Sequence, residues 1–214
     1  MRVVIAGGHG QVALQLERVL NERGDTPVGI VRNPDHVPDL ERASVEAVLL
    51  DLEDADVTAV VEVLDGADAV VFAAGGGPNS GAARKETVDR GAAVLLADAA
   101  EQAGVRRYVM VSSMGTGKAD PDSDDVFQVY LRAKKAADDD LATRDLDWTI
   151  VRPGRLTDDA GTGRVQVGTL GRGEVPRADV AAVLAEVLHT DATVGKTFDL
   201  LAGHQTIASA LAGL

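Results

Sequence analysis

Two side chains in the second half of the chain could move a proton together. Tyr130 and Lys134 are four residues apart in a stretch that predicts a helix, so they lie on one face, one turn apart. A neighbouring ammonium stabilises a phenolate, which makes a tyrosine a better general acid at neutral pH. Ser112 and Ser113 end the predicted strand before this helix, where a hydroxyl could hydrogen-bond a reacting carbonyl oxygen. The pattern indicates proton transfer to a carbonyl compound.

A glycine-rich turn near the start of the chain directly follows one predicted strand and directly precedes a predicted helix. Glycines let the backbone turn tightly and approach a pyrophosphate, whose charge then lies on free N–H groups at the helix N-terminus. In this context the turn predicts dinucleotide binding, although a plain tight turn is the alternative. The residues expected to contact the cofactor are Gly7, Gly8, His9, Gly10, Gln11 and Val12. We assign no chemical role to His9.

The end of the second predicted strand indicates which dinucleotide is bound. An NAD-binding unit usually places an acidic residue there, about twenty residues after the glycine turn, to hold the ribose 2′-hydroxyl. Arg32 occupies this strand end, and its planar guanidinium can pair with a 2′-phosphate, so NADP (NADPH) is favoured over NAD. A solvated arginine is the alternative. The adenine and its ribose are expected beside the residues after the third and fourth strands, namely Asp51, Leu52, Ala73, Ala74 and Gly75.

Short β-branched runs alternate with amphipathic stretches along the chain. Continuous apolar runs such as Val109–Val111 fit strands buried on both faces. This alternation predicts an α/β Rossmann fold, a doubly wound, mostly parallel sheet with helices on both faces. Strands are expected at Val3–Ala6, Pro27–Val31, Val45–Leu50, Ala69–Ala73, Tyr108–Ser112, Trp148–Arg152 and Thr197–Leu201, and helices at Gln11–Arg23, Asp54–Leu64, Glu86–Ala103, Val126–Thr143 and Arg177–His189.

One domain is expected over residues 1–214, since no repeat or long linker divides the chain. Two stretches predicted to be irregular, Gly75–Arg84 and Gly154–Gly173, each follow a strand. Loops beyond the carboxyl ends of parallel strands form the ligand crevice, so both stretches are candidates for its walls. Residues 154–173 are expected to be the loop on the substrate side.

The composition narrows the expected partners and compartment. The chain has 34 acidic and 21 basic residues, a net charge of −13, and no cysteine. Such a charge repels nucleic acid and anionic lipid, so a small-molecule substrate is expected and neither nucleic acid nor membrane is. No disulfide or thiolate chemistry is expected. The aspartates of 120–125 and 138–140 lack metal-ligand spacing, which predicts no metal. Met1–Ala6 runs directly into a strand, which favours a cytoplasmic protein.

The order of these motifs is similar to that of a known superfamily. The glycine turn, the paired serines, the Tyr-x-x-x-Lys pattern and the segment Trp148–Gly154 follow one another as in the short-chain dehydrogenases/reductases, which the chain resembles over essentially its whole length. More narrowly, it resembles the small atypical, extended-type members described as NAD(P)-binding or sugar-epimerase-like. Relatives of that branch include NmrA-like regulators and flavin/biliverdin reductases.

The resemblance implies a role for each motif. A serine orients the substrate carbonyl, a tyrosine transfers the proton, and a lysine assists the tyrosine and holds the nicotinamide ribose. By motif position these roles belong to Ser113, Tyr130 and Lys134, with Ser112 the less favoured serine. Pro153 and Gly154 match the loop that faces the nicotinamide. The residues expected around that end of the cofactor are therefore Ser112, Tyr130, Lys134, Pro153 and Gly154.

We expect an NADP-dependent oxidoreductase that transfers a hydride between the nicotinamide and a small carbonyl-type substrate, with Tyr130 as proton donor. A non-catalytic NADP-sensing regulator of NmrA-like type is one alternative, and a sugar-epimerase-like enzyme is another. Ala13 stands where glycine is frequent in the family. The chain is also shorter than a typical sugar epimerase, and this shorter length argues against epimerase chemistry. A sensor has no need of a proton donor, which favours the enzyme. Monomer and homodimer remain open.

Overall fold

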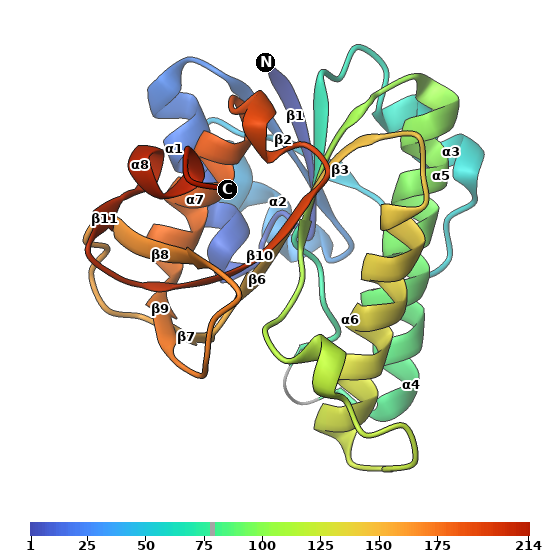
Figure 1. The fold of residues 1–214 in the computed structure, drawn as a ribbon. Coiled ribbons are helices and arrows are strands. Elements are labelled where there is room, and N and C mark those ends of the chain that lie inside the picture. The colour runs from blue at the N-terminus through green and yellow to red at the C-terminus, as the bar shows by residue number, and fades with distance from the viewer. Residues whose placement is uncertain (78–79) are drawn as a thin grey trace.

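A computed structural model describes residues 1–77 and 80–214 (Figure 1). The strands are β1 (Arg2–Ala6), β2 (Thr26–Val31), β3 (Glu46–Leu49), β4 (Ala69–Phe72), β5 (Arg107–Val111), β6 (Asp147–Pro153), β7 (Arg155–Thr157), β8 (Arg164–Gly168), β9 (Glu174–Pro176), β10 (Lys196–Ala202) and β11 (Gln205–Thr206). The helices are α1 (Gln11–Arg23), α2 (Val37–Arg42), α3 (Val57–Val63), α4 (Ala82–Arg84), α5 (Ala93–Ala103), α6 (Val126–Ala142), α7 (Arg177–Leu188) and α8 (Ile207–Leu211). A π-helical segment, η2 (Lys85–Ala92), joins α4 to α5, and short 3-10 turns are η1 (Pro34–His36), η3 (Thr116–Lys118) and η4 (Asp191–Thr193).

Within the described residues the strands form a nine-stranded sheet in the order β11-β8-β10-β6-β5-β4-β1-β2-β3. All neighbours are parallel except β8, which is antiparallel to both β10 and β11. Strands β7 and β9 form a separate parallel pair. The predicted α/β Rossmann fold, with a doubly wound and mostly parallel sheet, is confirmed.

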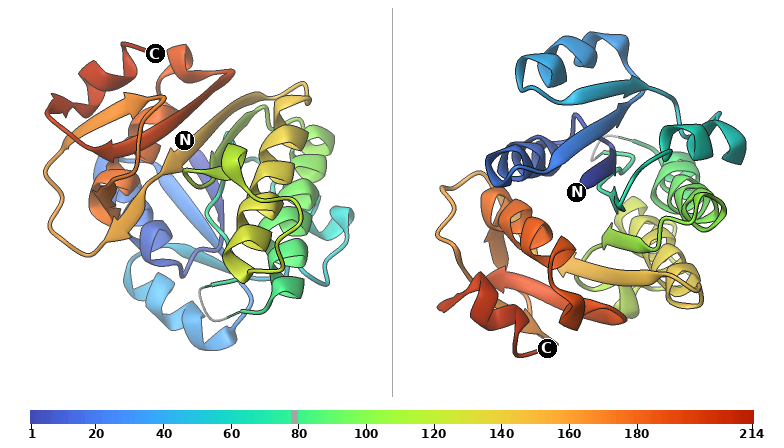
Figure 2. Two further views of the ribbon diagram at one scale, coloured as in Figure 1. Left: turned by 60° about the horizontal axis from the view of Figure 1, so that its bottom comes forward. Right: turned by 90° about the horizontal axis from the view of Figure 1, so that it is seen from above.

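Helices cover both faces of the sheet. Viewed from above, α1 and α7 lie on one side, and α5 and α6 lie on the other (Figure 2). Aliphatic side chains fill both layers: Leu16 and Leu184 belong to the core beneath α1 and α7, whereas Leu96 and Leu141 belong to the core beneath α5 and α6. Parallel strands between two helical layers bring all their carboxyl ends to one edge, which is where ligands of such sheets bind.

The sequence located the strands that form the centre of the sheet. Each of the seven predicted strands corresponds to one of β1–β6 or β10, and every end agrees within one residue. The stretch Gly154–Gly173, however, was wrongly predicted to be irregular, because β7 and β8 lie within it. The alternation of Val165 and Val167 with polar residues is a strand pattern, but glycines on both sides hid it. In the stretch Gly75–Arg84, residues 78 and 79 lie outside the described residues.

One buried carboxyl in α1 opposes folding. Glu17 is fully buried beneath the glycine turn, and within the described residues neither of its side-chain oxygens has a hydrogen-bond partner. Added Cβ atoms at Gly8 and Gly29 would lie 3.1 and 2.9 Å from its Oε1, so both glycines pack against it. Burial raises the pKa of Glu17 to about 8. The carboxyl is therefore protonated at neutral pH in the folded protein and ionised in the unfolded chain.

We predict that this difference makes stability fall with rising pH. Between the unfolded pKa of about 4.5 and the folded value of about 8, the folded state binds one proton more than the unfolded state. The free energy of unfolding should therefore decrease by up to about 1.4 kcal/mol per pH unit in this window. Glu17→Gln should remove that slope, as measured by urea unfolding at pH 5, 6, 7 and 8. The exposed Glu62→Gln is the control, and an unchanged slope in Glu17→Gln would contradict the assignment.

Candidate active site

The glycine turn after β1 is packed so closely that side chains would not fit. Gly7 has a φ of +82°, and a Cβ on it would lie 2.7 Å from the Cα of Ala74. A Cβ on Gly8 would lie 2.6 Å from the Cα of Gly29, and one on Gly10 would lie 3.1 Å from the Gly7 carbonyl oxygen. Gly10 caps α1 without a side-chain hydrogen bond. The first N–H groups of α1 can therefore bind an anion, as a pyrophosphate requires.

A cavity of about 380 Å³ lies beside this turn, at the carboxyl ends of β1 to β4. Its volume is within the usual range for small-molecule sites. Nine of the predicted cofactor-binding residues line it: Gly7, His9, Gly10, Arg32, Asp51, Leu52, Ala73, Ala74 and Gly75. The remaining residues of the turn lie outside its lining: Gly8 is buried beneath it, whereas Gln11 and Val12 belong to the first turn of α1.

Two arginines, Arg32 and Arg84, and two acids, Asp51 and Glu53, line this cavity. Arg84 donates to both carboxylate oxygens of Glu53, with Nε 3.3 Å from Oε1, and Thr87 donates to Oε1 at 2.6 Å. Arg32 Nη1 lies 3.5 Å from Glu53 Oε2. The Arg84 hydrogen bond is the main reason why the pKa of Glu53 is lowered. The sequence did not predict Glu53 as a site residue. Glu53 follows the third strand, whereas the acid that binds the ribose of NAD usually stands at the end of the second strand.

The histidine of the turn is held by a second histidine and an acid. His9 Nε2 lies 2.8 Å from an Asp39 carboxylate oxygen, and the rings of His9 and His36 stack with centroids 3.7 Å apart. Asp39 belongs to α2, and His36 belongs to the 3-10 turn η1 that follows Arg32. The segment after β2 thus forms one wall of the cavity. Sequence reasoning missed η1 and α2, which are too short to show a helical period.

A buried ion pair joins α6 to η2. Lys134 Nζ lies 3.4 Å from Asp89 Oδ1, with side chains 4% and 0% exposed. The same nitrogen donates to the carbonyl oxygens of Ala74, at 3.3 Å, and Val111, at 3.1 Å. The other Asp89 oxygen accepts from the Gly76 N–H at 3.1 Å. Lys134 therefore contacts both the cavity wall and the end of β5, where the paired serines follow.

Tyr130 lies one turn before Lys134 on α6 and is half-buried. Its ring is 5.3 Å from Lys85 Nζ, measured to the centroid, and 5.9 Å from the ring of Phe127. Asp125 starts this helix by accepting hydrogen bonds from the N–H groups of Phe127 and Gln128. Within residues 1–77 and 80–214 the Tyr130 hydroxyl has no hydrogen-bond partner, so a substrate can accept its proton.

The paired serines have different surroundings. The buried Ser112 hydroxyl donates to Asp138 Oδ2 at 2.8 Å, and Arg152 donates to the same oxygen through Nε at 2.9 Å. Burial raises the pKa of Asp138, while the Ser112 hydroxyl and Arg152 act against that shift. Ser113 is half-buried and donates only a 3.3 Å bond to the Met114 carbonyl. Of the two hydroxyls, that of Ser113 is therefore the one available to a substrate.

Pro153 and Gly154 lie next to the serines. The Met114 N–H donates to the Pro153 carbonyl at 3.0 Å, which continues the pairing of β5 with β6 beyond its last ladder pair. A Cβ on Gly154 would lie 2.5 Å from the Gly173 carbonyl oxygen. Both residues therefore hold the backbone of the predicted substrate-side loop against the carboxyl edge.

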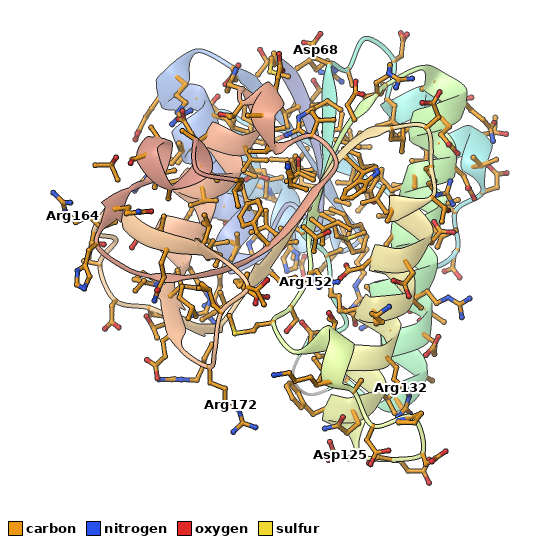
Figure 3. The ribbon with its side chains drawn as sticks, in the orientation of Figure 1. Asp68, Asp125, Arg132, Arg152, Arg164 and Arg172 are labelled. Carbon is orange, nitrogen blue, oxygen red and sulfur yellow. The ribbon has the colours of Figure 1, made fainter. Side chains whose placement is uncertain are left out.

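The substrate-side loop is held near its middle and is exposed near its C-terminal end. The buried Asp179 of α7 accepts the N–H groups of Thr162 and Gly163, at 2.9 and 2.7 Å. Figure 3 shows the Arg172 side chain projecting away from the ribbon, and Arg172 is exposed. No group of three metal-ligating side chains occurs among the described residues, and none of the described helices is long and apolar enough to cross a membrane.

A family model described as NAD(P)H-binding matches residues 7–191, from the glycine turn to the end of α7 and just beyond. The chain belongs to this NAD(P)H-binding family. The match spans the turn, the cavity and the Tyr-x-x-x-Lys helix, so the family's defining segment includes every part of the site described above. The expectation of a dinucleotide-binding protein is confirmed at this level.

Individual proteins of known sequence or structure are similar to this chain over nearly its whole length. The uncharacterized sugar epimerase YhfK of Bacillus subtilis is 33% identical over 99% of both chains. A Bacillus halodurans protein assigned to the NAD-dependent epimerases/dehydratases is 38% identical over the full length of both chains, with a TM-score of 0.92. The anaerobilin reductase ChuY of Escherichia coli O157:H7 is 25% identical over 94% of this chain and 97% of its own, with a TM-score of 0.79. The predicted resemblance to the epimerase-like and biliverdin-reductase-like branch is confirmed.

We predict that Gly10→Leu abolishes dinucleotide binding in a folded protein. Its Cβ would lie 3.1 Å from the Gly7 carbonyl oxygen, and the rest of the side chain would occupy the cavity beside the N-terminus of α1. Gly171→Leu is the matched control, because a Cβ on Gly171 meets nothing within 4 Å. Calorimetric titration with NADPH measures both. Retained affinity in Gly10→Leu would remove this turn from the cofactor site.

Proposed function

We propose that the protein is an NADP-dependent oxidoreductase that transfers a hydride between the nicotinamide and a small carbonyl-type substrate. The observation that carries the proposal is the position of Lys134 Nζ, which bonds the Ala74 carbonyl of the cavity wall and the Val111 carbonyl at the end of β5. The helix that bears Tyr130 is thereby attached to the dinucleotide cavity. A proton donor beside a dinucleotide site is the arrangement that carbonyl reduction needs.

The glycine turn and the cavity fit the pyrophosphate and the adenosine of a dinucleotide. The glycine turn and the start of α1 would hold the pyrophosphate, and the cavity lined by Asp51 and Leu52 would hold the adenosine. Arg32, at the cavity wall, would pair with a 2′-phosphate. The nicotinamide, when bound, would supply the hydride for reduction of the carbonyl carbon. Its end of the site would be formed by residues near Lys134, Pro153 and Gly154.

Three side chains would act on the carbonyl oxygen. Tyr130, whose hydroxyl is free within the described residues, would donate its proton to that oxygen. Ser113 would hydrogen-bond the same oxygen and orient it. Lys134, buried one turn along α6, would stabilise the phenolate that remains after the proton leaves. The Ser112 hydroxyl, already bound to Asp138, would hold the end of β5 in place.

The relatives support this reading at the level of reaction class. ChuY is named as an anaerobilin reductase, and its fold covers 94% of this chain. The names of YhfK and of the Bacillus halodurans protein favour a second candidate, an epimerase-type activity. The same tyrosine can serve both reactions, but an epimerase regenerates its dinucleotide in each turnover. Net oxidation of NADPH therefore separates the reductase from the epimerase.

We predict that Tyr130→Phe lowers turnover by about 10²–10⁴-fold, the contribution typical of general acid catalysis. NADPH affinity should barely change, because the phenol hydroxyl is assigned to the substrate. The measurement is NADPH oxidation with quinones, flavins, aldehydes and ketones, run beside a cofactor titration. Tyr108→Phe is the matched control: Tyr108 is buried, and its hydroxyl donates to the Ala93 carbonyl at 3.1 Å.

Two results would contradict this mechanism. Undiminished turnover in Tyr130→Phe would exclude that residue as the proton donor. Tight NADPH binding by the wild type, without net oxidation by any substrate of the panel, would favour the epimerase or a cofactor-sensing regulator. Racemisation or epimerisation of a sugar by the protein, without net loss of NADPH, would identify the protein as an epimerase.

We predict that Arg32→Ala lowers the affinity for NADPH but not for NADH. A charge-assisted pair with the 2′-phosphate has no counterpart in NADH, so its loss should cost about 1.5–3 kcal/mol, roughly ten- to a hundredfold in affinity. Titration with both dinucleotides gives the ratio of their dissociation constants. An unchanged ratio would exclude Arg32 as the 2′-phosphate ligand.

A further inference from the structure

An acidic side chain stands beside Arg32 in the cavity, where the proposed function places the 2′ position of the adenosine ribose. Glu53 follows Asp51 and Leu52 in the loop after β3, and all of them line the cavity together with Arg32. An acidic side chain that lies beside the adenosine ribose can bind a ribose hydroxyl, whereas an arginine there can bind a 2′-phosphate. The cavity therefore holds side chains of both kinds, and Glu53 is the acid that lies within 4 Å of Arg32.

Glu53 is held by several hydrogen bonds, whereas Arg32 is more exposed and makes one looser contact. Arg84 binds both carboxylate oxygens of Glu53, and the Thr87 hydroxyl binds Oε1 at 2.6 Å. The Glu53 side chain is 20% exposed and the Arg32 side chain 54%, and their closest approach is a loose 3.5 Å. A phosphate can thus draw Arg32 away from Glu53 without moving the carboxylate, which remains at the wall.

The fixed carboxylate has opposite effects on the two dinucleotides. Hydrogen bonding to Arg84 lowers the pKa of Glu53, so the group is ionised at neutral pH. A negative charge in the cavity repels a 2′-phosphate and competes with it for Arg32. The same carboxylate can accept a hydrogen bond from an unphosphorylated ribose hydroxyl.

We propose that Glu53 is a specificity-determining residue that limits the preference for NADPH conferred by Arg32 and lets the cavity accept NADH as well. This inference rests on the part of the proposed function that places the 2′-phosphate at Arg32. Arg84 and Thr87, which come from α4 and η2, act as positioning residues that hold the carboxylate at the cavity wall. The exposed cation Arg32 and the hydrogen-bonded anion Glu53 therefore together set the selectivity between NADPH and NADH.

The test is a titration of the full-length protein with NADPH and with NADH, which reports binding and needs no substrate. Glu53→Gln keeps the size of the side chain and removes its charge. The ratio of the NADH to the NADPH dissociation constant should rise about tenfold, mostly through tighter NADPH binding. The gain should shrink between 0.05 and 0.5 M salt (roughly a threefold shorter screening length), because it is electrostatic. Glu53→Ala is a second variant, expected to shift the ratio in the same direction.

Glu62→Gln removes one acidic charge from an exposed position outside the cavity lining and should leave the ratio unchanged. An unchanged ratio in both Glu53 variants, with Arg32→Ala still lowering NADPH affinity, would overturn this inference and leave the proposed function intact. An unchanged ratio in Arg32→Ala, or no dinucleotide binding by the wild type, would instead count against the proposed function itself. A ratio that rises in Glu53→Gln and not in Glu62→Gln supports the inference.

Discussion

The buried contact between Lys134 and Asp89 connects the parts of the site that come from distant segments. It links α6 to η2, while Lys134 also bonds the carbonyls after β4 and at the end of β5, and Asp89 bonds the Gly76 N–H. Removing one partner of a buried pair typically costs about 3–5 kcal/mol, because the other charge stays buried and unpaired. The relative position of the cavity wall and the Tyr130 helix therefore depends on this pair.

A second buried carboxylate, that of Asp138, also holds α6 against the carboxyl edge of the sheet. Asp138, one turn beyond Lys134 on α6, is bound by Ser112 at the end of β5 and by Arg152 of β6. Two acids thus hold α6 against three neighbouring strand ends, and Tyr130 projects from the same helix. Glu17 shows the opposite case: it is a buried carboxyl with no partner among the described residues, and it lies beneath the turn that we propose to bind the dinucleotide. The edge that forms the site is accordingly rich in buried polar groups, which are costly unless paired.

Short sequence motifs predicted those parts of the site whose residues are close together in the sequence. The glycine turn was found because Gly7 and Gly10 stand directly between a strand and a helix, and the Tyr130–Lys134 spacing follows from the helical period. Asp89, Asp138 and Glu53 were missed as parts of the site because their partners are 13 to 45 residues away in sequence, and only the folded sheet brings them together. The short strands β7 and β8 were missed for a related reason, since each is completed by pairing with a distant strand.

A crystal structure of the protein with NADPH bound would test the proposed site most directly. We predict that the pyrophosphate lies at the glycine turn and the first turn of α1, the adenosine in the cavity beside Arg32, and the nicotinamide beside Tyr130 and Lys134. A dinucleotide bound away from the glycine turn, or one whose nicotinamide lies out of reach of Tyr130, would contradict this prediction.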